Sequence, residues 1–155
     1  MRRGVAPLAM TGSVTMAEQR LADRSAIADL FTRYAVALDN GEVETVVACF
    51  TADAALKSPV IDLQGTDAIR AFAGRFAALR AAGTQFRHLI ANIAVELDGE
   101  RAHATAYLLV LISKDGGHRT LPPGRYECDL VKTDGLWRFS RRTVFHDHDY
   151  TLDGL

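Results

Sequence analysis

The chain has 155 residues, of which 48% are hydrophobic and 24% charged, which is the size and composition of one globular domain with a substantial core. Its 18 basic and 19 acidic side chains nearly cancel, and no basic stripe interleaved with aromatic residues is present, so nucleic acid is excluded as the expected partner. The longest apolar run, at residues 106–112, is far shorter than the roughly 20 residues that cross a bilayer, so no membrane association is expected.

Residues 1–16 mix glycine, proline and small side chains without periodicity, which predicts a disordered leader. They lack the apolar core of roughly 7 to 15 residues that a secretory signal contains, so a cytoplasmic location is expected. Residues 17–150 are predicted to form one domain, followed by a short tail at residues 151–155. Cys49 and Cys128 have no metal-like spacing, so reduced, buried thiols are expected.

Three helices are predicted in the first half of the chain. The first begins at Ala17 and ends at Asn40-Gly41, and its apolar side chains recur at helical spacing: Leu21, Ile27, Leu30, Phe31, Tyr34 and Leu38. A short second helix, over residues 42–49, should pack back on the first. The third should begin at Gly65-Thr66 and end near Gly83, with three arginines facing outward: Arg70, Arg75 and Arg80.

The rest of the chain is predicted to be strand and turn. Short strands at residues 54–58 and 60–64 precede the third helix. After it, strands at 86–97 and 101–113 are joined by Asp98-Gly99, and strands at 125–133 and 137–146 by Asp134-Gly135, both typical hairpin signals. Residues 115–123, rich in glycine and proline, are predicted to be a loop.

Helices that precede an antiparallel meander favour the α+β class over a doubly wound parallel sheet. A long, strongly twisted sheet curls, and helices can cover one side of the curl. We therefore expect an apolar pocket between the helices and the sheet, at the wide end of the curl.

Three segments carry a resemblance to a known family: residues 21–50 (LADRSAIADLFTRYAVALDNGEVETVVACF), residues 87–108 (RHLIANIAVELDGERAHATAYL) and residues 124–142 (GRYECDLVKTDGLWRFSRR). Together they resemble the SnoaL-like branch of the nuclear-transport-factor-2-like superfamily. The resemblance implies a cone-shaped curved antiparallel sheet wrapped around N-terminal helices, the cystatin-like α+β barrel, with a blind pocket. Because the superfamily contains both enzymes and binding proteins, function has to be argued from the site.

Asp39 and His88 are the first candidate site residues. Asp39 ends the first predicted helix, where the helix dipole disfavours an anion and makes a carboxylate a better base. Alternatively, Asp39 and Glu42 form a capping box for the second helix. His88 shares a strand face with Phe86 and points into the pocket if that face is concave. Alternatively, it is an ordinary structural histidine. The resemblance implies a catalytic Asp39–His88 pair, as in the family's scytalone dehydratase and hexachlorocyclohexane dehydrochlorinase.

The remaining candidates are a tyrosine from the first helix and three strand residues. Tyr34 matches a catalytic tyrosine of the similar bile-acid 7α-dehydratase, although core packing explains it equally. Arg142 matches an active-site arginine of the dehydrochlorinase and is a predicted substrate-binding residue; a solvated arginine is the alternative, and Arg138 and Arg141 compete for the role. Two further substrate-binding candidates are expected to line the pocket if their faces are concave: Asn92 and Tyr126.

The sequence departs from these relatives in ways that affect the expected chemistry. Residues 104–113 contain no histidine and no acid, where scytalone dehydratase has a second histidine and the bile-acid enzyme an acid, so a more apolar pocket is expected. His146 and His148 have the spacing of strand ligands, but two ligands do not make a metal site. We expect them to belong to a frayed C-terminus, with neither metal nor cofactor.

The predicted function is that of a cofactor-independent lyase, dehydratase or isomerase that uses an Asp–His general base. Its substrate would be a small apolar molecule with a hydroxyl or carbonyl group, of polyketide, steroid or terpenoid type. The alternatives are a non-catalytic small-molecule-binding module and a scaffold subunit resembling a dioxygenase β subunit. The resemblance also implies a homodimer formed through the exposed face of the sheet.

Overall fold

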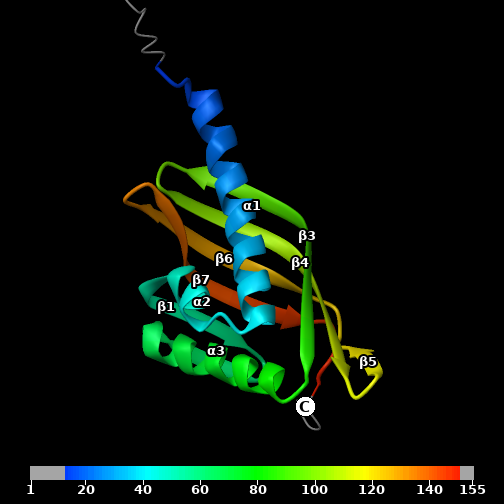
Figure 1. The fold of residues 1–155 in the computed structure, drawn as a ribbon. Coiled ribbons are helices and arrows are strands. Elements are labelled where there is room, and N and C mark those ends of the chain that lie inside the picture. The colour runs from blue at the N-terminus through cyan, green and yellow to red at the C-terminus, as the bar shows by residue number, and fades with distance from the viewer. Residues whose placement is uncertain (1–12, 151–155) are drawn as a thin grey trace, which may run out of the picture.

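The computed structural model describes residues 13–150, so the predicted tail and most of the predicted leader lie outside the described residues. Two helices come first, and a third follows two short strands (Figure 1). The elements are α1 (Met16–Asn40), α2 (Val43–Ala48), β1 (Phe50–Ser58), β2 (Ile61–Gln64), α3 (Gly65–Ala81), β3 (Gln85–Asp98), β4 (Arg101–Lys114), β5 (Gly117–Thr120), β6 (Gly124–Thr133) and β7 (Leu136–His146).

Helix α1 has well-defined signals at both ends. Thr15 and Glu18 form a capping box in which each side chain accepts a hydrogen bond from the other's backbone N–H, so Thr15 is the N-cap and the helix begins at Met16. Gly41 ends the helix in the left-handed conformation, at φ 74°. A Cβ on Gly41 would lie 3.1 Å from the Cα of Ala77, so glycine also allows the end of α1 to approach α3.

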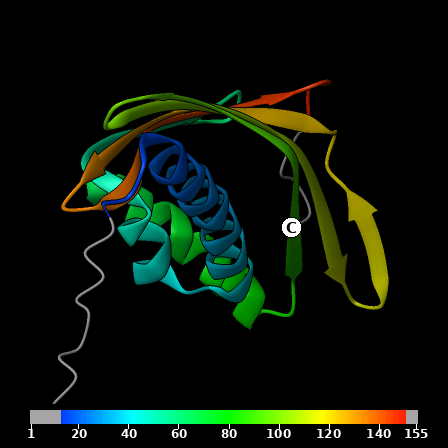
Figure 2. The same cartoon turned by 90° about the horizontal axis from the view of Figure 1, so that it is seen from above.

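The sheet curls over the helices, and α1 crosses its concave side (Figure 2). The apolar stripe predicted for α1 is the buried face, with Ile27, Phe31 and Leu38 each at most 2% exposed. Phe31 packs edge-on against Phe139 of β7, with ring centroids 5.2 Å apart. The core therefore lies between α1 and the concave face, as the helical periodicity indicated.

The sheet has the strand order β2-β1-β7-β6-β4-β3, with β5 attached to β4, and its edges do not meet. The α+β class and the curved sheet are confirmed. A wholly antiparallel sheet is not, because β1 pairs with β7 in parallel. Hairpin signals report only on strands joined by a turn, whereas β1 and β7 come together from opposite ends of the domain.

Both predicted hairpins are present, and two further hairpins join β1 to β2 and β4 to β5. The turn Asp134-Gly135 has two positive φ angles, 53° and 75°, as a two-residue type I′ turn requires. Asp115-Gly116 has the same geometry, at 50° and 78°, and joins β4 to β5. The prediction of a loop over residues 115–123 was therefore wrong for residues 117–120, which form β5, because this Asp-Gly pair was not recognised as a hairpin turn.

Both cysteines are free and buried, as predicted, and burial raises the pKa of each thiol. Among the described residues, no helix is both long enough and apolar enough to cross a bilayer. A cytoplasmic location stays a prediction.

Candidate active site

A cavity of about 380 Å³ lies between helices α1 and α3 and the concave face of the sheet. Its wall is made mainly of leucine, valine, isoleucine and phenylalanine side chains. The polar or ionisable side chains that line it are Tyr34, Ser58, Arg75, His88, Tyr126, His146 and Tyr150. This is the size and character of a pocket for a small, mostly apolar ligand with a few groups that fix its orientation.

Asp39 and His88 form a close pair at this pocket. The Nδ1 atom of His88 lies 2.6 Å from Oδ1 of Asp39, and the backbone N–H of His88 donates to Oδ2 of Asp39 at 2.8 Å. Both side chains are less than a tenth exposed. Because a carboxylate can only accept, Nδ1 carries the proton and Nε2 keeps its lone pair. The arrangement is that of an imidazole base oriented by a carboxylate.

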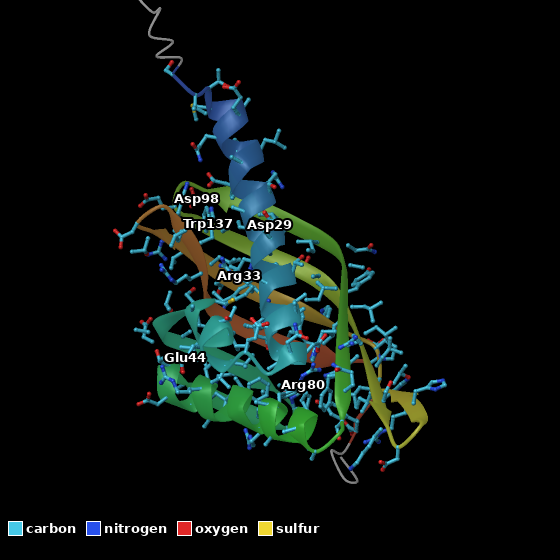
Figure 3. All side chains as sticks on the ribbon, viewed as in Figure 1. Asp29, Arg33, Glu44, Arg80, Asp98 and Trp137 are labelled. Carbon is cyan, nitrogen blue, oxygen red and sulfur yellow. The ribbon has the colours of Figure 1, made fainter. Side chains whose placement is uncertain are left out.

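The capping interpretation of Asp39 is wrong. The N-cap of α2 is Glu42, which makes no side-chain capping bond, while both carboxylate oxygens of Asp39 are directed to His88 on β3. The backbone carbonyl of Asp39 accepts from the side chains of Arg80 and Gln85. Figure 3 shows Arg80 at the end of α3 that faces the C-terminus of α1. These bonds fix the end of α1, and with it the carboxylate.

Tyr34 and Tyr126 line the pocket from α1 and β6, and both are 2% exposed. Their rings meet edge to face, with centroids 6.5 Å apart. Burial raises the pKa of both hydroxyls, an effect that the charge of Arg142 opposes. Both are therefore protonated at neutral pH and are hydrogen-bond donors. Core packing and a place at the site are not alternatives for Tyr34, since it does both.

Arg142 does not reach the pocket, which corrects its predicted substrate contact. Its side chain is completely buried behind Tyr34 and Tyr126, and its Nε donates to the thiol of Cys128 at 3.3 Å. Its guanidinium carbon lies 3.9 to 4.9 Å from four ring centroids: those of Phe31, Tyr34, Tyr126 and Phe139. The solvated alternative is equally wrong for Arg142.

Of the two competing arginines, Arg141 bonds to Asp129 at 2.5 Å with more than half of its side chain exposed. Arg138 donates to the backbone carbonyl of Thr133, at 3.5 Å. Neither lines the pocket.

Asn92 lies outside the pocket, which corrects its predicted place in it. Between Ala91 and Ala94, strand β3 advances by one residue more than its partner β4, and Asn92 adopts a left-handed φ of 53° in this bulge. The extra residue reverses the alternation of faces. His88 therefore faces inward, whereas Asn92 is exposed.

Residues near the mouth of the pocket were missed by the sequence analysis. Arg75 is exposed on α3, as predicted, but also lines the mouth. His146 is not frayed: it is the last residue of β7, it is half-buried, and its Nδ1 lies 2.8 Å from the carbonyl oxygen of Pro122. The signal that could have placed His146 at the pocket is the alternation of side chains on β7, since Arg142, Val144 and His146 share the inner face.

Within residues 13–150, no three histidine, cysteine, aspartate or glutamate side chains are grouped in a way that could hold a metal ion. The lining offers no cluster of charged side chains for a phosphate-bearing cofactor either, since Arg75 is its one arginine or lysine. The polar side chains that line the pocket can transfer protons and form hydrogen bonds.

Comparison with solved structures finds the same fold in several bacterial proteins. A Mycobacterium tuberculosis protein of unknown function, solved as a single-residue variant, is 26% identical, with a TM-score of 0.79 over 89% of this chain and 79% of the other. A Novosphingobium aromaticivorans protein provisionally described as a scytalone dehydratase is 22% identical, with a TM-score of 0.77 over 88% and 93% of the two chains. A Catenulispora acidiphila protein in complex with S-DNPA is 26% identical, with a TM-score of 0.72 over 82% and 95%.

Other matching structures are described as having a cystatin-like fold, one of them as NTF2-like. Comparison with curated protein sequences gives no match. The family model of the SnoaL-like domain matches residues 19–143, which include most of α1, the Asp39–His88 pair and nearly all of the sheet. The chain therefore belongs to the SnoaL-like domain family.

Proposed function

We propose that this protein is a cofactor-independent lyase or isomerase that removes a proton from carbon in a small, mostly apolar substrate. The observation that carries the proposal is the Asp39–His88 pair, 2.6 Å apart and nearly excluded from water, at the wall of an apolar pocket. A substrate with a carbonyl or hydroxyl group beside the reacting carbon fits this chemistry, as polyketides, steroids and terpenoids do.

In the proposed reaction, Nε2 of His88 takes the proton from carbon. Asp39 holds the imidazole in the tautomer with a free Nε2 and stabilises the imidazolium that forms. The electron pair of the broken C–H bond becomes a double bond. In an elimination, a hydroxyl then leaves as water with a proton from a donor, whereas in an isomerisation the proton returns to another carbon.

Tyr34 and Tyr126 are the proposed donors to the oxygen on which negative charge develops. Their hydroxyls remain protonated, and hydrogen bonds in a pocket that excludes water stabilise charge more than they do in bulk solvent. The buried cation of Arg142 makes each phenol a stronger acid than burial alone would allow. Arg142 therefore supports the substrate-binding groups without touching the substrate.

A test that does not require the natural substrate is the ring opening of 5-nitrobenzisoxazole. A base removes the proton on carbon 3, the N–O bond breaks, and coloured 2-cyano-4-nitrophenolate is released. Asp39→Asn and His88→Gln should each lower the rate about 10² to 10⁴-fold, the usual contribution of a general base.

The matched control is His103→Gln. His103 also pairs with an aspartate, Asp129, at 3.0 Å, but both side chains are more than a third exposed. The control should leave the rate unchanged. A rate in the wild-type protein no higher than that of imidazole in buffer, or equal rates in all variants, would contradict the proposal.

A non-catalytic binding module is the second candidate, favoured by the predominance of apolar side chains in the pocket wall. Ligand binding that survives in Asp39→Asn and His88→Gln, with no turnover in any variant, would support it. For either function we propose a homodimer through the outer face of the sheet, where two large apolar side chains are exposed: Leu89 and Tyr107. Sedimentation of wild-type and Tyr107→Asp proteins would test this association.

A further inference from the structure

The rim of the pocket carries a second histidine that the proposed chemistry does not use. His146 ends β7 and lines the same cavity as His88. His146 is paired with Gly124, Gly124 with Leu108, and Leu108 with Ile90, two residues along β3 from His88. Three strand spacings correspond to about 14 Å along the sheet, and less across the curve. The two imidazoles therefore belong to opposite sides of one pocket.

The hydrogen bond at Nδ1 determines what His146 presents. A carbonyl oxygen has no proton, so Nδ1 of His146 donates to the carbonyl of Pro122 at 2.8 Å. In the neutral ring Nε2 is then an acceptor only. Among the described residues, no side chain or backbone group donates to it. His146 thus offers a lone pair whose direction is fixed by the protein.

The segment that holds His146 is anchored at several points. The backbone N–H of Asp147 donates to the carbonyl of Pro123 at 2.9 Å, beside the bond to Pro122. The ring of Tyr150 packs edge-on against the imidazole, with centroids 4.6 Å apart. Ser58 and Tyr150, which also line the mouth, provide hydroxyl groups close by. The mouth is therefore a built polar site rather than a frayed end.

We infer that the ligand of this pocket carries a hydroxyl group at its far end, and that this hydroxyl donates to Nε2 of His146. The ligand class is then a compact alcohol, phenol or enol, ring-containing and otherwise apolar, with the reacting carbon at His88. A cavity of about 380 Å³ that extends from one histidine to the other suits a molecule of two or three fused rings.

A carboxylate at the same end is the competing chemistry, because Arg75 also lines the mouth. Arg75 is exposed, however, and water weakens its attraction for an anion. Nε2 of a neutral His146 accepts directly from a hydroxyl, whereas a carboxylate, which has no proton to donate, would first need the ring to be protonated. The geometry therefore favours the hydroxyl.

The test is a comparison of two ligands in calorimetric binding. Naphthalene-2,6-diol carries a hydroxyl at each end, and 6-methoxy-2-naphthol has nearly the same shape with one donor fewer. The diol should bind the wild-type protein about 3- to 10-fold more tightly, the effect of one net hydrogen bond. His146→Leu should abolish this preference, while His146→Gln, which keeps an acceptor, should retain part of it.

His148→Leu is the matched control, since His148 is exposed two residues further along and does not line the pocket. It should leave the preference intact. A preference that survives in His146→Leu, no preference in the wild-type protein, or no diol binding up to its solubility limit would overturn the inference. The inference would also be overturned if the wild-type protein bound 6-hydroxy-2-naphthoate more tightly than the diol and Arg75→Gln lost that advantage.

This inference rests on the proposed function only in placing the reacting carbon of the ligand at His88. The binding measurement that tests it does not require turnover. A preference that depends on His146, in a protein that does not open 5-nitrobenzisoxazole, would support the hydroxyl site and reject the catalytic proposal. Turnover that depends on His88, with a preference indifferent to His146, would do the reverse.

Discussion

Replacing Arg142 with methionine should make the protein more stable and less active. The guanidinium is completely buried, and its two terminal nitrogens have no hydrogen-bond partner among the described residues. Each unsatisfied buried group costs about 1 to 3 kcal/mol. Stacking on four aromatic rings returns about 2 kcal/mol. For the two nitrogens together the balance is about 0 to 4 kcal/mol against the arginine. Methionine fills most of the same volume without a charge, so a gain of up to about 4 kcal/mol is expected.

Urea unfolding followed by tryptophan fluorescence measures the first half of this prediction, and the melting temperature should rise by about 2 to 4 °C for each kcal/mol gained. Turnover of 5-nitrobenzisoxazole measures the second half, because without the cation the pKa of Tyr34 rises further and its hydroxyl becomes a weaker donor.

Arg141→Met is the matched control, since this exposed arginine should change stability by less than about 1 kcal/mol. If Arg142→Met instead lowered the free energy of unfolding by more than about 1 kcal/mol, the contacts of Arg142 with the four aromatic rings would be a net source of stability. A functional reason would then not be needed to explain the buried cation.

Two further changes test the parts of the fold that position the site. Asp23 accepts from Lys132 and Trp137; burial opposes its charge, but these bonds lower the pKa of its carboxyl overall. Urea titrations at pH 7 should therefore show the wild-type protein to be more stable than Asp23→Asn by about 1 to 3 kcal/mol. This difference should shrink as the pH falls below 3.8, the ordinary pKa of an aspartate carboxyl. Gly41→Ala should lower the free energy of unfolding by about 1 to 3 kcal/mol and lower turnover, because residue 41 has a left-handed backbone and the new Cβ would meet Ala77. Gly74→Ala has open space around the new Cβ and should instead stabilise α3 by about 1 kcal/mol in the same titrations.

Local signals predicted most of the architecture. Helical periodicity located α1 and its buried face, and the Asp134-Gly135 pair located the last hairpin, because both depend on residues close together in the chain. The pairing of Asp39 with His88 came from the family resemblance, and its geometry agrees with that expectation. Residue pattern alone left capping as an equal interpretation of Asp39.

What could not be predicted depends on bulges and on distant strands. An extra residue near Asn92 turns that side chain outward, and a register shift between β6 and β7 near Ser140 places Arg142 inside. Strict alternation gives the wrong face after either irregularity. The parallel contact of β1 with β7 joins strands that no turn connects. The orientation of the His146 ring could not be predicted for a related reason, since it depends on a carbonyl from the loop before β6.

The measurement that tests the central claim most directly is a double-mutant cycle on the dyad, with 5-nitrobenzisoxazole as substrate. If Asp39 acts through the imidazole, the double variant Asp39→Asn/His88→Gln should turn over no more slowly than His88→Gln alone, because the carboxylate has no separate part in the reaction. Losses that multiply in the double variant would show that the two side chains act independently and would contradict a carboxylate-oriented base in this pocket.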